Sequence, residues 1–495
     1  MRRSGILLSV SSLPSPWGIG AMGAAAREFV DFLAASGQGV WQLLPLGPTG
    51  FGDSPYQSFS TFAGNPYLID LDDLARDGLL AREEYADLPW GDDPLSVDYA
   101  ALYRQRFGVL GWAVSRLRDA RAGELAAFCE RERGWLEDYA LYMAIKESLG
   151  GAPLSDWPEG LRRREGAALA DARRDLAGRV AFWRGVQFLF FEQWGRLRAY
   201  AHERGVELLG DVPIYVSGDG ADVWAHPELF QLDADLRPTE VAGVPPDGFS
   251  EDGQLWGNPL FDWGRMAEDG YAWWVERLAA HLRLFDLVRI DHFRGLDAYY
   301  AVPAGDATAR RGRWRPGPGI ELLRCVQRAL GEGRLVAEDL GYLTASVAEL
   351  REEAGLPGMR VLEFAFDSQD GTGSPYLPHS YPRDCVAYVG THDNDTALGW
   401  LSGALPDDTA AACDYLGLNE GEGEGWGMMR GIWASAADLA IVQMQDVLGL
   451  GSEARMNVPS TVGGNWCWRM PEGYATPELE ARLGRLMRLY GRAPR

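Results

Sequence analysis

The sequence has little cysteine, a single lysine and no long apolar run. Its five cysteines are widely spaced and form no CxxC pair, so neither a disulfide framework nor a thiolate zinc site is indicated. We therefore expect a reducing, cytoplasmic compartment. The single lysine, Lys146, leaves little room for Schiff-base chemistry or a P-loop, because both need a placed lysine.

Positive charge is scarce as well. The 47 Lys and Arg residues face 71 Asp and Glu, which gives a formal net charge of −24. An acidic surface repels phosphate backbones and anionic lipids, so nucleic acids and membrane surfaces are poor partners and a neutral substrate fits better. No stretch approaches the roughly 18 apolar residues of a transmembrane helix, and the apolar run near the N-terminus is too short for a signal peptide. Nothing indicates an obligate protein partner.

Short apolar, β-branched runs recur between longer helical patterns, and they are typical of buried parallel strands. The eight runs are residues 6–12, 40–46, 206–216, 287–292, 335–340, 360–366, 385–389 and 455–458. They predict an α/β chain folded as one (β/α)₈ TIM barrel over residues 1–495. Two excursions surround its C-terminal face: a helical insertion at 70–180 after the second strand, and a loop-rich insertion at 217–272 after the third.

Motifs for cofactors and metals are weak or missing. Gly18, Gly20 and Gly23 spell the GxGxxG of dinucleotide-binding loops, but Pro14, Ser15, Pro16 and Trp17 intervene after the preceding strand, and the next strand lacks the terminal acid that holds a ribose. Neither HxH nor HExxH occurs, so clustered metal ligands are not indicated. We expect no cofactor and no catalytic metal.

Four of the expected strands carry acids at or near their carboxyl ends: Asp211, Asp291, Glu338 with Asp339, and Asp393 with Asp395. A lone acid at a strand end is usually a helix cap or a salt-bridge partner. Four acids meeting at the mouth of a parallel barrel are costly to gather, and this favours a functional site there. Cleavage of a glycosidic bond suits the set, because it pairs a carboxylate nucleophile with a carboxylic acid that protonates the leaving oxygen.

Aromatic residues give a softer argument for a carbohydrate substrate. The chain has 19 tryptophans, and flat rings in loops can stack on the apolar faces of sugars. Six are expected in loops: Trp224, Trp256, Trp263, Trp314, Trp466 and Trp468. For any one of them, packing within the loop layer is an equally good interpretation.

At these acids and tryptophans the sequence resembles the amylomaltases, the 4-α-glucanotransferases of the α-amylase clan. The resemblance runs from residue 4 almost to the end. The most specific segments are SLPSPWGIG, GDSPYQSFSTFAGNPYLIDL, GDVPIYV, RIDHFRG, VAEDLG, GTHDNDT and RMNVPSTVGGNW. The resemblance implies a (β/α)₈ barrel that needs no metal or organic cofactor. It also implies α-1,4-glucan and maltodextrin donors, and glucose or maltodextrin acceptors.

Carried over by motif, the resemblance assigns Asp291 as nucleophile, Glu338 as acid/base and Asp393 as a third carboxylate that holds substrate hydroxyls in a retaining double displacement. It places further substrate-binding side chains at Tyr56, Tyr99, Asp211, Arg289 and His392, and on lids over the acceptor side at Phe249, Trp256 and Asn465. Two alternatives stay open: an α-amylase-like glucan hydrolase and a catalytically silent glucan-binding protein.

Overall fold

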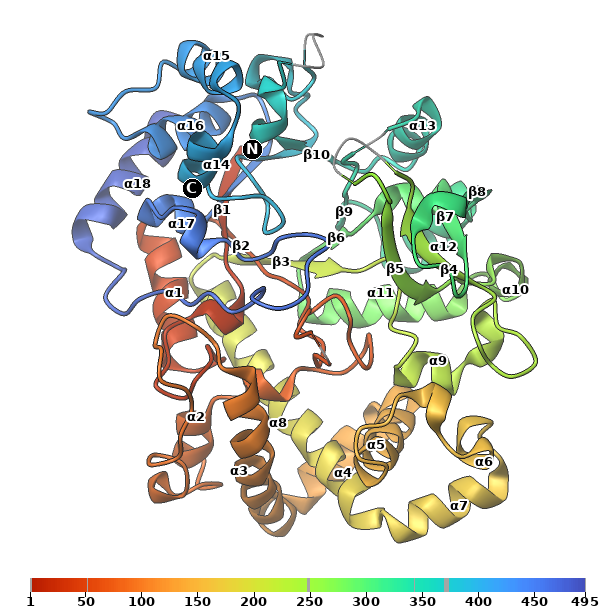
Figure 1. Ribbon diagram of the computed structural model, residues 1–495. Helices are drawn as coiled ribbons and strands as arrows, with labels where there is room; N and C mark the ends of the chain where they lie inside the picture. Colours follow the sequence, from red (N-terminus) through yellow and green to blue (C-terminus); the bar gives the residue numbers. More distant parts are fainter. Residues whose placement is uncertain (1, 51, 247–249, 342, 369–373, 495) are drawn as a thin grey trace.

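The computed structural model describes residues 2–50, 52–246, 250–341, 343–368 and 374–494, and Figure 1 shows its course. Eight parallel strands form one sheet in the order β10-β11-β12-β1-β2-β3-β6-β9. Their bounds are β1 Arg3–Leu7, β2 Val40–Gln42, β3 Glu207–Val212, β6 Leu287–Ile290, β9 Leu335–Ala337, β10 Gly358–Val361, β11 Cys385–Tyr388 and β12 Leu439–Gln443. A hydrogen bond of 2.9 Å from Ala337 N to Pro357 O joins the two end strands, so the sheet closes almost completely. The expected (β/α)₈ barrel is confirmed.

Side chains of each barrel strand alternate between two buried clusters. In β12, Leu439 and Ile441 belong to the cluster inside the barrel, whereas Ala440 and Val442 pack in the outer cluster between strands and helices. This alternation follows from the two-residue period of a strand. The interior is therefore packed with side chains.

Helices cover the outside of the barrel. In α1, which spans Ala24–Ala35, the buried residues Phe29, Phe32 and Leu33 share one face, and the helix is followed by Gly37, whose φ of 74° suits glycine. The other helices of this outer layer and of the C-terminal part are α8 Ala177–Glu203, α11 Ala272–Leu284, α12 Gly319–Leu330, α13 Ala345–Glu353, α14 Ala397–Gly403, α15 Pro406–Leu416, α16 Glu424–Ala434, α17 Met444–Leu448 and α18 Pro477–Leu489.

The eighth strand differs from the sequence prediction. It is β12, and the predicted run 455–458 lies instead in an irregular segment beyond α17. β12 passes directly into α17 at Met444. The apolar run that spans both elements is therefore also compatible with a helix, and its first half was not predicted as a strand. The segment 455–458 still contributes to the barrel, because the side chain of Met456 is buried in the interior cluster.

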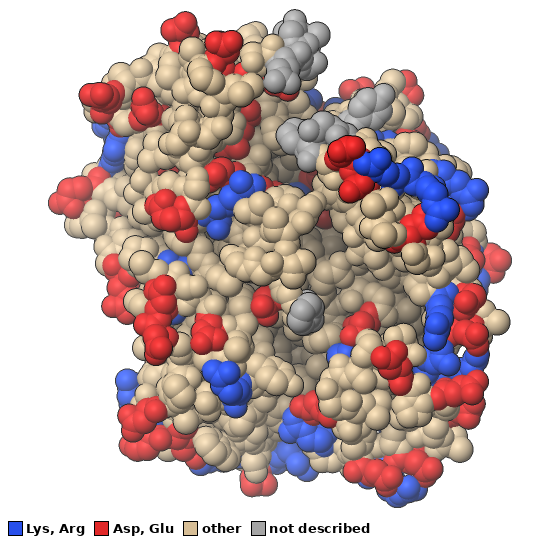
Figure 2. Space-filling view, in the orientation of Figure 1, with Lys and Arg blue, Asp and Glu red and all other residues tan. Residues whose placement is uncertain are grey.

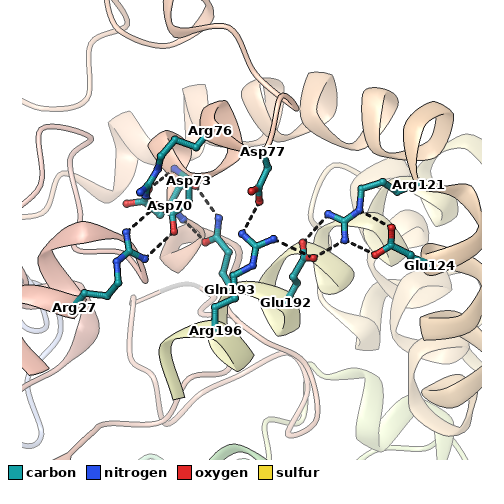
Figure 3. Close-up of polar contacts among 10 residues, drawn as sticks. All are labelled: Arg27, Asp70, Asp73, Arg76, Asp77, Arg121, Glu124, Glu192, Gln193 and Arg196. Atoms are coloured by element: carbon teal, nitrogen blue, oxygen red, sulfur yellow. Dashed lines mark hydrogen bonds and ion pairs between the residues drawn. The ribbon is translucent and has the colours of Figure 1, made fainter. Parts of the chain in front are cut away.

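The chain between β2 and β3 contains the helices α2 Leu71–Arg76, α3 Tyr99–Ala120, α4 Ala122–Arg131, α5 Arg133–Ser148, α6 Glu159–Arg162 and α7 Gly166–Asp175, followed by α8. Most of them lie in the lower part of Figure 1. Figure 3 shows the polar contacts that tie α8 to this segment. The Gln193 amide exchanges hydrogen bonds of 2.7 and 3.0 Å with the backbone of Asp70, and Arg196 contacts Asp77 at 2.7 Å.

Residues 217–268 and 298–316, on either side of α11 and β6, add a four-stranded antiparallel sheet beside the barrel, in the order β5-β4-β7-β8. Its strands are β4 Glu240–Val244, β5 Gln254–Pro259, β7 Ala298–Pro303 and β8 Arg313–Pro316, and two short helices are α9 Ala221–Ala225 and α10 Trp263–Glu268. The prediction that six tryptophans lie in loops is wrong for four of them, because Trp224 and Trp263 are helical and Trp256 and Trp314 lie in strands. The Gly- and Pro-rich composition predicted loops, but backbone pairing between the strands of the antiparallel sheet gives these segments a regular structure.

Figure 2 shows acidic and basic side chains interspersed around the rim of one face, which is hollowed near its centre, where Figure 1 labels β5 and β6. Within the described ranges, none of the helices combines the length and the apolar character needed to cross a bilayer.

Candidate active site

Strands β3 and β6 bring two carboxyl groups to one guanidinium. Asp211 and Arg289 are partners in the parallel register, and Asp291 follows the last residue of β6. Arg289 Nη1 lies 2.6 Å from Asp211 Oδ2 and 3.0 Å from Asp291 Oδ1. The side chain of Asp211 is fully buried, whereas that of Asp291 is 26% exposed. Arg289 thus holds the Asp291 carboxyl group by an ion pair, while part of this carboxyl group stays exposed to solvent.

Tyr56 extends this chain of contacts to the loop after β11. Its hydroxyl donates to Asp211 Oδ2 at 2.6 Å and lies 2.8 Å from His392 Nε2. His392 Nε2 in turn lies 3.3 Å from Asp393 Oδ2. Arg289, Asp211, Tyr56 and His392 therefore connect Asp291 with Asp393 through a chain of side-chain contacts, although the two acids are about a hundred positions apart in sequence.

Glu338, directly after β9, is held by backbone amides. The N–H of His292 donates to its Oε2 at 2.6 Å, and the N–H of Leu340 donates to its Oε1 at 3.0 Å. His292 is the residue after Asp291, so this hydrogen bond fixes the Glu338 carboxyl beside Asp291. The two carboxyl groups consequently share one region of the barrel mouth.

Burial and the charges of neighbouring carboxylates raise the pKa values of Asp291 and Glu338. Burial raises the pKa of Asp291 to about 7; Arg289 opposes the shift, and Asp211 and Asp393 add to it. Burial raises the pKa of Glu338 to about 8, again opposed by Arg289 and increased by the charge of Asp291. Arg289 forms an ion pair with Asp291 but none with Glu338 within the described part of the chain. We therefore assign the first ionisation of the pair to Asp291.

Trp256 contacts this group of residues, whereas Tyr99 and Asn465 form their hydrogen bonds elsewhere in the described structure. The Trp256 ring lies edge-on to His292, with centroids 4.7 Å apart. Tyr99 donates its hydroxyl to Trp466 O at 3.0 Å. Asn465 bonds within its own loop, accepting from Val458 N at 3.0 Å. Phe249 lies outside the described residues.

Asn457 contacts the site and was missed by sequence reasoning, and Trp466, expected only as one of six tryptophans that could stack on a sugar, contacts it as well. Asn457 donates from Nδ2 to Asp393 Oδ1 at 2.6 Å, and the ring of Trp466 lies 5.8 Å from that of Tyr56. Both belong to the RMNVPSTVGGNW segment, from which the resemblance pointed to Asn465 but not to the roles of these two side chains. In the described part of the chain, no group of three or more His, Cys, Asp or Glu residues is arranged to hold a metal ion.

Fold and site together define a (β/α)₈-barrel protein whose mouth is lined by interacting carboxyl groups. The family model described as 4-alpha-glucanotransferase matches residues 8–475. A 4-alpha-glucanotransferase of Thermus thermophilus is 50% identical, over 97% of this chain and 97% of the relative, and one of Clostridium butyricum is 43% identical over 98% and 100%. The structure of an amylomaltase of Streptococcus agalactiae in complex with acarbose superposes with a TM-score of 0.97 at 40% identity, covering 100% of both chains. The chain belongs to the 4-α-glucanotransferase family.

Proposed function

We propose that Asp291, Glu338 and Asp393 carry out the 4-α-glucanotransferase reaction of this chain by a retaining double displacement. The observation that carries this assignment is the hydrogen bond from His292 N to Glu338 Oε2, because it sets an acid with a raised pKa beside Asp291. Retaining glycosidases use such a pair, one carboxylate as nucleophile and one carboxylic acid as proton donor. The family relationship supports the same roles.

In the first step, ionised Asp291 attacks the anomeric carbon of an α-1,4-linked glucose unit. The bond from that carbon to the glycosidic oxygen breaks, and Glu338 gives its proton to the departing 4-oxygen. Arg289 supports this division of roles, since its ion pair favours the ionised form of Asp291. The product of the step is a glycosyl ester on Asp291.

In the second step, Glu338 is a carboxylate and accepts the proton of the 4-hydroxyl of an incoming glucose or maltodextrin. The acceptor oxygen bonds to the anomeric carbon and Asp291 leaves, so the donor segment ends on the acceptor with its α configuration retained. Transfer in place of hydrolysis requires that water be kept from the ester, which a covering loop can provide. We assign this task to the segments around Phe249, Trp256 and Asn465.

The remaining polar residues position the sugar. Asp393 is 42% exposed, and its two oxygens are oriented by Asn457 and His392, so it can accept hydrogen bonds from substrate hydroxyls. We place Tyr56 and Asp211 beneath it as the connection to Arg289, and Tyr99 as a support of the Trp466 segment. All five cysteines are free, which supports a reducing, cytoplasmic location.

The stereochemistry of rescue by azide tests the assignment. With α-maltosyl fluoride, which needs no acid to leave, Glu338→Ala should still form the ester, and azide should release it as α-maltosyl azide. Asp291→Ala cannot form the ester, so azide should attack directly and give the β-azide. Proton NMR distinguishes the two anomers. The same anomer from both variants would contradict the separate roles.

The products from maltotriose separate transfer from hydrolysis. A short incubation should give glucose and a ladder of longer maltodextrins, because each released segment is captured by another sugar. Shortening without any longer product would support an α-amylase-like hydrolase, and binding without turnover would support a silent glucan-binding protein.

A further inference from the structure

A second group of acids lies beneath the loop that carries His392 and Asp393, and the reaction described above does not use it. The loop, residues 389–396, connects β11 with α14. Glu363 approaches it from the end of β10 and Asp446 from α17. Both are buried, with exposures of 6% and 2%. Each has one buried oxygen, Glu363 Oε1 and Asp446 Oδ2, without a hydrogen-bond partner in the described structure.

Glu363 packs directly against the start of this loop. Its backbone N donates to Val389 O at 3.1 Å. A Cβ added to Gly390 would lie 2.6 Å from Glu363 Oε1, so a larger residue there would displace the carboxyl group. The side chain of Asn394 also donates to Glu363, while its own Oδ1 accepts from the Thr391 backbone N at 3.0 Å. Glu363 is therefore in contact with both halves of the loop.

Asp446 holds the other end of the loop. Its Oδ1 accepts from Ala397 N, the first residue of α14, at 2.7 Å. Asp395 lies between the two acids in sequence and accepts from Ser452 Oγ at 2.8 Å. The cation facing this group is Arg455, 3.8 Å from Asp395 Oδ2, and it also donates to the backbone oxygen of Asp393 at 2.7 Å.

The charges of this group do not balance if every acid is ionised. Among the described residues, three carboxyl groups, those of Glu363, Asp395 and Asp446, then face the guanidinium of Arg455. A buried group without a counter-charge takes its neutral form. Burial, reinforced by the charges of Asp446 and Asp395, raises the pKa of Glu363 well above its ordinary value. A neutral Glu363 has an O–H to donate, and Asp446 Oδ2 is a buried acceptor that lacks a donor.

We propose that Glu363 is a positioning residue for the transfer reaction: as a neutral acid it donates a hydrogen bond to Asp446 Oδ2, and this bond supports the loop that presents His392 and Asp393 to the substrate. The inference rests on the proposed role of Asp393. Ionisation of Glu363 replaces the hydrogen bond with repulsion between two buried carboxylates, so the loop loosens and transfer stops.

The pH dependence of kcat/KM tests this proposal, because Glu338 and Glu363 must both keep their protons. The alkaline limb of log(kcat/KM) should fall with a limiting slope of about −2 in the wild type. In Glu363→Gln the amide N–H replaces the acid O–H, so kcat/KM at pH 6 should stay within about twofold of the wild type and the slope should become about −1. The same slope in both enzymes, or a loss of activity in the variant at pH 6, would overturn the proposal.

A second variant keeps the test decisive if Glu363→Gln does not fold. Asp446→Asn removes the charge that raises the pKa of Glu363, so the alkaline limb should move to lower pH. An unmoved limb would count against the proposal. Asp222→Asn is the matched control: Asp222 is 5% exposed and lies in α9, away from this loop, so its variant should keep the wild-type slope.

Asp393→Asn separates this inference from the proposed function. An inactive Asp393→Asn together with an unchanged slope in Glu363→Gln would remove the inference alone. An active Asp393→Asn would remove the role of Asp393 and the inference with it.

Discussion

Two networks of acids and arginines in this molecule use the same residue types for different ends. At the barrel mouth, the buried Arg289 contacts Asp211 and Asp291, and Asp393 adds a third carboxyl group through Tyr56 and His392. In the network of Figure 3, arginines and acids alternate along α8 and its neighbours. Its members are Arg27, Asp70, Asp73, Arg76, Asp77, Arg121, Glu124, Glu192, Gln193 and Arg196.

The two networks differ in charge balance and, around Arg121, in access to water, although Asp70 and Asp73 in the network of Figure 3 are also buried. Arg121 contacts both Glu124 and Glu192, and these hydrogen bonds raise its pKa further, so the group stays charged over the whole physiological range. At the barrel mouth burial dominates instead, and the pKa values of Asp291 and Glu338 rise to about 7 and about 8. Paired, partly solvated charges hold helices together, whereas crowded, buried acids become titratable near neutral pH.

Replacing one carboxylate in each network should separate them most clearly. Asp291→Asn removes the proposed nucleophile without changing its size, and we expect kcat to fall on the order of 10⁴-fold or more. Glu192→Gln makes the same chemical change in the network of Figure 3 and should leave kcat within about twofold. Initial rates of glucose release from maltotriose measure both. Similar losses in the two variants would show that the fall reflects damage to folding.

Glu338→Gln should have the next largest effect and should also change the pH profile. Loss of the proton donor is expected to lower kcat/KM by about 10²- to 10⁴-fold on maltotriose. The wild type should lose activity above about pH 8, because the acid form of Glu338 disappears there. In the variant the contribution of Glu338 should be absent from the glycosylation step with α-maltosyl fluoride, whose leaving group needs no proton, so that the ionisation of Glu363 alone remains and the limiting slope is about −1. A limiting slope of about −2 in that step would assign the ionisation near pH 8 to another group.

Arg289→Met should be costly for stability as well as for activity. The variant leaves Asp211 fully buried with Tyr56 as its remaining hydrogen-bond donor from a side chain, and an uncompensated buried charge costs about 3–5 kcal/mol. Removing the guanidinium also raises the pKa of Asp291 further, so the acid limb of kcat/KM should move to higher pH. Urea unfolding at pH 7.5 and pH–rate profiles measure the two effects. A loss of stability below about 1 kcal/mol would show that Arg289 is not needed to compensate Asp211.

The barrel could be predicted from the sequence because its strands are short apolar runs with a shared rim of acids. Seven of the eight predicted runs overlap barrel strands. The eighth prediction was wrong because β12 continues without a break into α17. Hydrophobic periodicity alone could not show where the strand ends and the helix begins. The antiparallel sheet of residues 240–316 was also missed, since its strands are rich in Gly, Pro and Trp and are stabilised by backbone pairing between distant segments.

In the candidate site too, residues marked by a local sequence pattern could be predicted, whereas residues that depend on contacts between distant segments could not. Asp291 and Glu338 could be found as acids at strand ends, because a parallel barrel gathers those ends at one face. Asn457 could not, since its hydrogen bond to Asp393 depends on how an irregular segment returns across the barrel mouth. The neutral state expected for Glu363 was equally hidden, because it follows from burial beside Asp446, which is far from it in sequence.

The smallest expected effect comes from Arg196→Ala in the network of Figure 3. Arg196 is 44% exposed and contacts Asp77 at 2.7 Å and Glu192 at 3.2 Å, and an ion pair so open to water contributes at most about 1 kcal/mol. Salt screens such pairs, so the difference from the wild type in urea unfolding should shrink further between 0.05 and 0.5 M NaCl, roughly as the Debye length falls. The loss in Arg289→Met should persist over the same range, because its partner Asp211 is shielded from solvent. Equal salt sensitivity in the two variants would mean that burial does not distinguish the networks.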